Sequence, residues 1–167
     1  MRTSELNREA LNFAVAKALG HEVMMFDDLF IANALCKGFD INRIMGHLAW
    51  QHDQGKYIIV EVRNLQLDQM HPENLTPTRC AKEIPDYCGD WAQGGPIIER
   101  ELISIESAFK AAGYDPGGWY WRAACITEDD KAFFIDGPTP LIAAMRCYVA
   151  SKLGDEIEIP EELQWNP

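Results

Sequence analysis

The clearest pattern of hydrophobic and polar positions lies in residues 137–154, GPTPLIAAMRCYVASKLG. Large apolar side chains recur there at helical spacing, at Leu141, Met145, Tyr148, Val149 and Leu153. Thr139 can cap a helix with its hydroxyl, Pro140 suits the first helical position, and Gly154 tolerates the turn that ends a helix. Arg146 falls outside the apolar stripe. The pattern predicts one helix over residues 140–153 with the stripe buried.

A second helical pattern opens the chain. Thr3 or Ser4 can cap a helix that runs to about Leu19, and Gly20 then ends it. One face of this helix is apolar and is made by Leu6, Ala10, Phe13, Ala14 and Ala18. We therefore expect an N-terminal helix with one buried face.

The segment from 21 to 87 has mixed patterns. Residues 29–37 suit a short helix capped by Asp27 or Asp28. Hydrophobic and polar residues alternate over 57–63, which predicts a half-buried strand, paired as a hairpin with 47–50 across a polar turn. Residues 68–87 contain three prolines and little periodicity, so they predict a long loop.

The segment before the C-terminal helix suggests short elements. Residues 97–101 suit a short strand, and residues 104–112 suit a small helix that Ser104 caps. A DPGG turn at 115–118 leads into a strand over 119–126, and residues 132–135 return antiparallel to it. Helices mixed with hairpins predict an α+β fold. We expect a single domain over residues 1–167, in which a small antiparallel sheet packs against the long C-terminal helix and the N-terminal helix.

Composition and charge restrict the partners. The chain has 167 residues and a formal net charge of −11, which repels the phosphate backbone and disfavours nucleic-acid binding. Most acidic chains are acidic for solubility, although some imitate nucleic acid. No apolar run is long enough to span a membrane, and the first residues show no signal region. The five cysteines lack disulfide spacing and are expected to be free thiols in a reducing cytosol.

The most unusual segment for chemistry is DWAQGGPIIERE, residues 90–101. Two glycines before a proline favour a turn with outward amide groups, beside an indole, a side-chain amide and a guanidinium. The candidate ligand-binding residues here are Asp90, Trp91, Gln93, Gly94, Gly95 and Arg100. The alternative is a tight turn with Trp91 in the core and Arg100 paired to Glu99 or Glu101.

Three further features contribute to the predicted ligand-binding site. Trp119 and Trp121 share one face of the predicted strand, and Arg122 lies on the other, so either face could stack a ring near a charge. The alternative is that both indoles belong to the core. The helix start at Thr139 offers amides to an anion, and Arg146 lies about two turns further on. We expect the three segments to converge on one concave site, which could lie at the interface of a homo-oligomer.

No pattern supports a metal or a cofactor. Cys80, Cys88 and His71 lie in one predicted loop without the spacing of a zinc site. Glu99 and Glu101 share a strand face, but nothing distinguishes them from a solvated edge. No P-loop, nucleophile-elbow or dinucleotide motif is present. We therefore expect no metal, no cofactor and no catalytic residues.

Two stretches resemble the NinX-like family of small bacteriophage proteins. They are residues 3–20 and 88–163, above all DWAQGGPIIERE, Trp121–Ala123 and the segment 137–154. Residues 21–87 differ from that family pattern, which implies a family-variable insertion with a hairpin and a long loop. The resemblance implies a phage accessory protein in the host bacterial cytoplasm, and it implies no established activity or site residues.

Three functions stay open. The first is a non-enzymatic counter-defence protein that sequesters a small, phosphorylated, nucleotide-like signal. The second is an acidic inhibitor or adaptor of a host or phage protein, which the acidic second half favours. The third is a small enzyme of unknown reaction. If a ligand binds as proposed, Arg100→Ala is expected to abolish its retention without changing the melting temperature.

Overall fold

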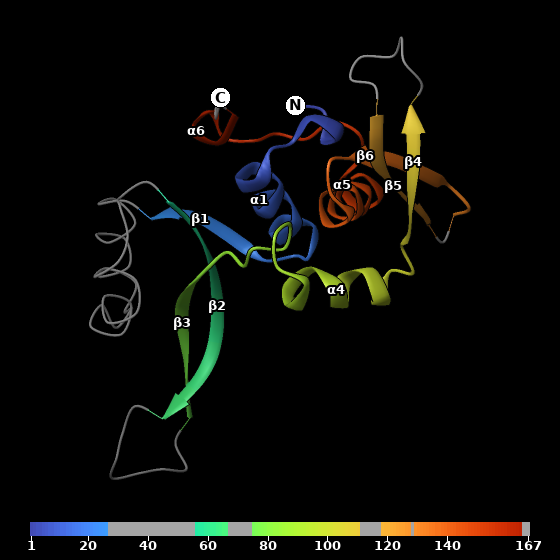
Figure 1. Cartoon of the computed structure of the whole chain (residues 1–167). Helices are drawn as coiled ribbons and strands as arrows, with labels where there is room; N and C mark the ends of the chain where they lie inside the picture. Colours follow the sequence, from blue (N-terminus) through green and yellow to red (C-terminus); the bar gives the residue numbers. More distant parts are fainter. Residues whose placement is uncertain (27–55, 67–74, 111–117, 128, 165–167) are drawn as a thin grey trace. The chain divides into compact units, whose positions relative to one another are not determined.

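The computed structural model of the chain describes residues 1–26, 56–66, 75–110, 118–127 and 129–164 (Figure 1). The chain divides into two compact units, one of residues 1–19 and 85–167 and the other of residues 20–84. Helices and two antiparallel sheets make a mixed α+β fold, as the sequence predicts. The interpretation of residues 1–167 as one domain with a family-variable insertion at 21–87 stays a prediction.

Helix α5, Pro140–Leu153, is the centre of the first unit and confirms the predicted helix. Thr139 caps it, accepting a hydrogen bond from the Ile142 amide at 3.2 Å. The helix is buried almost all round, as expected of a helix enclosed by other elements. The expectation that Leu153 is buried is wrong: its side chain lies in the last turn and is 42 % exposed.

Four elements surround α5: the helices α1 and α4, the 3-10 turn η1 and the sheet β4–β5–β6 (Figure 1). The N-terminal helix begins later than predicted, because η1 covers only Thr3–Glu5 and Leu6 is extended. Helix α1, Arg8–Ala18, starts after Asn7, whose side chain accepts from the Ala10 amide at 2.9 Å.

The sheet of the first unit has the order β4–β5–β6, with all pairs antiparallel. Its strands are Ser104–Lys110, Gly118–Ile126 and Ala132–Gly137. Strands β5 and β6 confirm the predicted hairpin. The helix predicted over 104–112 is wrong where the structure describes it, because these residues form the edge strand β4. Alternation along β5 and β6 buries Ala123 and Ile135 toward α5 and leaves Phe134 on the open face.

Helix α4, Trp91–Arg100, replaces both the turn and the strand predicted for this segment. Asp90 starts the helix by accepting a hydrogen bond from the Ala92 amide at 2.9 Å. Gly94 is helical and is needed for close packing, since a Cβ there would lie 2.4 Å from the Tyr87 carbonyl oxygen. Pro96 lies inside the helix and removes one of its hydrogen bonds.

The second unit contains an antiparallel sheet of order β1–β2–β3. Its strands are Glu22–Phe26, Lys56–Gln66 and Leu75–Glu83. Strand β2 confirms the strand predicted over 57–63, and it pairs with β1 and β3. The predicted partner 47–50 and the predicted helix 29–37 lie outside the described residues. The loop predicted over 68–87 is wrong in part, because it contains β3, an edge strand that accommodates Pro77.

A short helix, α6 (Glu161–Gln164), ends the described part of the chain. Asn7 Nδ2 donates a hydrogen bond of 3.4 Å to the Leu163 carbonyl, so the segment after α5 returns to the start of α1. Within the described ranges, no helix has the length and apolar character needed to cross a membrane.

Candidate ligand-binding site

A pocket of about 630 Å³ lies where β6 ends and α5 begins. It is called the Arg122 pocket below, and its polar and aromatic lining is Lys110, Trp119, Tyr120, Arg122, Asp136 and Arg146. Ser4, Phe134, Ile135, Gly137 and Pro138 complete the lining. Its lining residues therefore come from all three strands of the sheet, from η1 and from α5.

Asp136 pairs with two of the cations that line the Arg122 pocket. Its Oδ1 accepts a hydrogen bond of 2.9 Å from Arg122 Nε, and its Oδ2 lies 3.3 Å from Lys110 Nζ. The β5–β6 register makes this possible, because Arg122 and Asp136 are direct cross-strand partners. Burial opposes ionisation of Asp136, but the hydrogen bonds from Arg122 and Lys110 prevail and lower its pKa.

Aromatic rings lie directly beside these cations. Lys110 Nζ is 4.5 Å and the Arg122 guanidinium carbon 5.4 Å from the centre of the Tyr120 ring, within cation–π range. The Trp119 side chain is 77 % exposed and meets Phe109 edge to face, with ring centres 5.3 Å apart. The alternative that Trp119 belongs to the core is therefore wrong, and its indole is open to a stacking partner.

Arg146 forms the inner wall and has an unusual set of partners. Its Nη1 donates to the Asp136 carbonyl at 3.1 Å and its Nη2 to the Leu6 carbonyl at 2.8 Å. Nε is buried without a hydrogen-bond partner, and no carboxylate in the described ranges pairs with the guanidinium. Burial lowers the pKa of Arg146, since it disfavours the charged form. The positive charge of Arg146 is thus not neutralised by an acidic side chain of the described residues.

The turn into α5 fixes the shape of this wall. A Cβ at Gly137 would lie 2.6 Å from the Ala143 backbone nitrogen, so only glycine allows the end of β6 to approach the helix this closely. Thr139 lies two residues further on, and its hydroxyl is already used as the α5 cap. Thr139 therefore adjoins the pocket without lining it.

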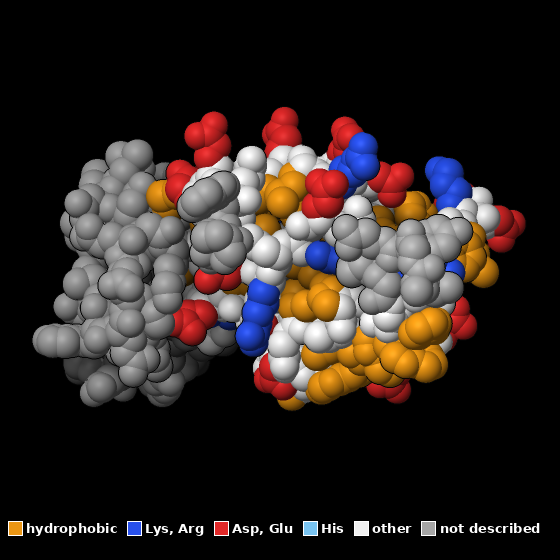
Figure 2. Space-filling view, turned by 45° about the horizontal axis from the view of Figure 1, so that its top comes forward, with side chains coloured by type: hydrophobic (Ala, Val, Ile, Leu, Met, Phe, Trp, Pro, Cys, Tyr) orange, Lys and Arg blue, Asp and Glu red, His pale blue; other side chains and the backbone are white. Residues whose placement is uncertain are grey.

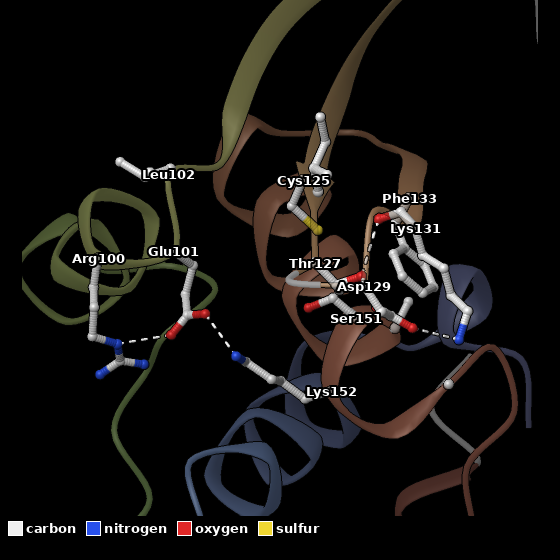
Figure 3. A pocket seen from close by; sticks show the side chains of 13 residues that line it. Arg100, Glu101, Leu102, Cys125, Thr127, Asp129, Lys131, Phe133, Ser151 and Lys152 are labelled. Carbon is white, nitrogen blue, oxygen red and sulfur yellow. Dashed lines mark hydrogen bonds and ion pairs between the residues drawn. The ribbon is translucent and has the colours of Figure 1, made fainter.

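A second pocket, of about 820 Å³, lies near the other end of α5 (Figure 3). Its charged residues are Arg100, Glu101, Asp129, Lys131 and Lys152, and it is called the Arg100 pocket below. Figure 3 shows Glu101 between the side chains of Arg100 and Lys152, each at 2.8 Å. Burial opposes ionisation of Glu101, but hydrogen bonds from Lys152 and Arg100 lower its pKa. Lys131 pairs with Asp129 at 2.8 Å. Every cation of this pocket already has a carboxylate partner.

The predicted convergence of three segments is wrong for the α4 segment. Trp119, Arg122 and Arg146 line the Arg122 pocket, whereas Arg100 lines the second pocket, and the two pockets share no residue. Arg100 is paired to Glu101, as the alternative interpretation had it. Trp121 and the other candidate residues line neither pocket: Asp90, Trp91, Gln93, Gly94 and Gly95. Asp90 caps α4, Gly94 packs it, and Trp91 is 55 % exposed rather than part of the core.

The sequence-based prediction missed Lys110, Tyr120 and Asp136 of the Arg122 pocket. The predicted hairpin of 119–126 with 132–135, extended by one residue, places Asp136 opposite Arg122, so this pair could have been found. Tyr120 lies on the same face of the predicted strand as Arg122, so alternation along the strand could have found it. Lys110 could not have been found, because its segment was predicted to be helical.

The described residues contain no group of three or more His, Cys, Asp and Glu side chains that could hold a metal ion. We therefore identify no candidate metal-binding site among the described residues.

One family model matches the chain, over residues 2–152, and its description reads Bacteriophage P22, NinX. The match spans the predicted insertion, the first stretch on which the resemblance rests, and residues 88–152 of the second. No curated protein matches the chain.

Proposed function

Because the chain belongs to the bacteriophage P22 NinX family, we propose that it is a phage accessory protein of the host cytoplasm that binds and sequesters a small nucleotide-like molecule without transforming it. In this proposal the molecule is a signal of host defence. The observation that carries the ligand class is the Arg122 pocket, which combines cations with an exposed indole. Nucleotide-like molecules combine anionic oxygens with a flat ring, and each part has a matching group there.

The local charge supports an anionic ligand. The lining contains three cations, Lys110, Arg122 and Arg146, and one carboxylate, Asp136, an excess of two positive charges. The whole chain carries −11, so its overall field repels an anion. A local excess of opposite sign is what an acidic protein needs to bind a phosphorylated molecule.

The geometry also supports a ring. Trp119 is the most exposed aromatic side chain of the pocket, and it is braced from the side by Phe109. Stacking on such a side chain contributes about 1–3 kcal/mol per base. Strand alternation places the Trp119 indole on the sheet face opposite Tyr120 and Arg122, but Trp119 and the three cations line the same pocket, which is large enough for an anionic group and a stacked ring.

Calorimetry with linear and cyclic mono- and dinucleotides tests the proposal. Trp119→Ala and Arg122→Ala are expected to weaken the binding of the preferred nucleotide by about tenfold or more. Arg100→Ala is the matched control, because it removes an arginine from the other pocket and should leave affinity unchanged. The nucleotide should be recovered intact after long incubation, which separates sequestration from catalysis. Failure of every nucleotide to bind, or an equal loss in Arg100→Ala, would refute the proposal.

A protein inhibitor or adaptor is the second candidate, and exposed apolar surface favours it. Phe109 and Trp119 on one face of the sheet, and Ile126 and Phe134 on the other, are each at least 60 % exposed. Figure 2 shows hydrophobic side chains gathered in one area of the face that it draws, with acidic side chains at its margin. Contiguous apolar surface with a polar rim is typical of protein interfaces. Ile126→Lys with Phe134→Lys should then abolish binding to a host or phage protein.

A further inference from the structure

Two cysteines from different elements lie next to each other in the core of the first unit. Cys125 is on β5 and Cys147 is on α5, and their sulfur atoms are 3.2 Å apart. Both are free thiols, 6 % and 0 % exposed. We propose that this pair is an oxidative modification site, at which a peroxide converts Cys125 and Cys147 into a disulfide that joins β5 to α5.

The proximity is sufficient for bond formation. A disulfide has a sulfur–sulfur distance of about 2.05 Å, so the two sulfur atoms need to approach by roughly 1 Å. Cys125 Sγ also lies 3.8 Å from the Cys147 carbonyl oxygen, which shows that the β5 side chain reaches the helix backbone. Small adjustments of two side chains therefore bring the sulfur atoms into bonding distance.

One of the two thiols lines a pocket. Cys125 is among the residues that line the Arg100 pocket (Figure 3), which is open to solvent, whereas Cys147 does not line it. A molecule as small as hydrogen peroxide can enter a pocket of about 820 Å³. Cys125 is therefore the thiol that meets the oxidant, and Cys147 is the thiol that resolves the product.

The reaction balances as a two-electron oxidation. The Cys125 sulfur, after losing its proton, attacks one oxygen of hydrogen peroxide, the O–O bond breaks, and a sulfenic acid and water form. The Cys147 sulfur then attacks the Cys125 sulfur, the S–S bond forms, and the hydroxyl leaves as water with the Cys147 proton. Two thiols and one peroxide give one disulfide and two waters. Burial raises the pKa of Cys147, but its position beside the sulfenic acid gives it a high effective concentration.

The bond would connect the central strand of the sheet to the central helix. It closes a loop between positions 125 and 147 and so restricts the unfolded chain, which raises the stability of the oxidised form. Cys125 and Cys147 do not line the Arg122 pocket, so the inference stands independently of the proposed ligand.

Peptide mapping of the full chain tests the inference directly. The protein is treated with hydrogen peroxide, alkylated without reduction, digested and analysed by mass spectrometry. We expect a crosslinked peptide pair containing Cys125 and Cys147, lighter by two hydrogen atoms than the separate peptides and released by dithiothreitol. The melting temperature should rise on oxidation and return on reduction.

Single Cys→Ala variants distinguish oxidation of the Cys125–Cys147 pair from oxidation of the other cysteines. Cys125→Ala and Cys147→Ala should each abolish the crosslink and the rise in melting temperature. Cys88→Ala is the control, because Cys88 is also buried but has no cysteine partner in the described residues. Full alkylation of Cys125 and Cys147 after peroxide treatment would overturn the inference, as would a crosslink of either one to Cys36 or Cys80. The wild-type map decides the question even if a buried variant fails to fold.

Discussion

Arg146 Nη2 donates a hydrogen bond of 2.8 Å to the backbone carbonyl of Leu6, 140 positions earlier in the chain. Nη1 of the same guanidinium donates to the Asp136 carbonyl, at the end of β6. One side chain of α5 therefore binds both the segment that leads into α1 and the strand that precedes α5. The same arginine lines the Arg122 pocket, so it belongs to the scaffold as well as to the candidate site.

Arg146→Met is expected to lower the free energy of unfolding by about 1–3 kcal/mol, because two backbone carbonyls lose a charged donor. Urea denaturation measures the change. Arg100→Ala is the control, since its side chain is 56 % exposed and it should change stability by only about 0.5 kcal/mol. An Arg146→Met protein as stable as the wild type would mean that burying the charge costs as much as the two hydrogen bonds contribute.

The core of α5 supplies a second prediction. Leu141→Ala or Met145→Ala should each cost about 2–5 kcal/mol, because both side chains are at most 4 % exposed and truncation leaves a cavity. Leu153→Ala removes the same atoms as Leu141→Ala from a side chain that is 42 % exposed, so we expect a clearly smaller loss. Equal losses at Leu141 and Leu153 in denaturant unfolding would contradict the burial pattern.

The sequence predicts those elements whose local signals agree with their packing. Helix α5 has a cap, a proline at its start and a glycine at its end, and the β5–β6 hairpin has clear alternation. The family resemblance also extended to the segments that form α4 and α5. These features are encoded locally, so they can be read without knowledge of distant contacts.

Segments 90–101 and 104–110 were misassigned because distant contacts decide them. Gly94 and Pro96 favour a turn locally, but Gly94 lets α4 pack against the Tyr87 backbone, and this packing outweighs the propensity. Likewise, β4 forms its hydrogen bonds with β5, and no pattern within residues 104–110 predicts this pairing. The candidate site was wrong in part for the same reason: Arg100 was grouped with Trp119 by the chemistry of their side chains, without a signal for where α4 lies.

Two neighbouring glycines of α4 give different predictions for the same substitution. Gly94→Ala places a Cβ 2.4 Å from the Tyr87 carbonyl oxygen and 2.8 Å from Leu141 Cδ2, so α4 must shift and the protein loses stability. Gly95→Ala meets no atom outside its chain neighbours and the helix backbone closer than 3.9 Å, so it should change stability little, because the helix-propensity gain of about 0.5–1 kcal/mol is offset by contact of the new Cβ with the ring of Pro96. Thermal unfolding of the two variants compares them directly. If both changes stabilise the protein, α4 does not pack as closely as the structure shows.

Asp86 supplies a prediction about pH. Its Oδ1 accepts hydrogen bonds of 3.0 Å from Arg8 Nε, Asn12 Nδ2 and the Gly89 amide, which tie α1 to the segment before α4. The hydrogen bond from Arg8 is the largest cause of the lowered pKa of Asp86, and those from Asn12 and Gly89 lower it further. A carboxyl whose pKa is lower in the folded chain stabilises the fold while it is ionised.

The contribution of Asp86 should be complete above its unfolded pKa of about 3.9 and should disappear as the pH falls through the lower folded value. Asp86→Asn is therefore expected to destabilise the protein at pH 7 and to converge with the wild type in strong acid. Urea titrations at a series of pH values measure the difference. Arg8→Ala and the double variant complete the cycle: if Arg8 acts through Asp86, Arg8→Ala changes little once Asp86 is Asn. A difference between wild type and Asp86→Asn that persists unchanged in strong acid would show that Asp86 stabilises the fold by packing and not by its charge.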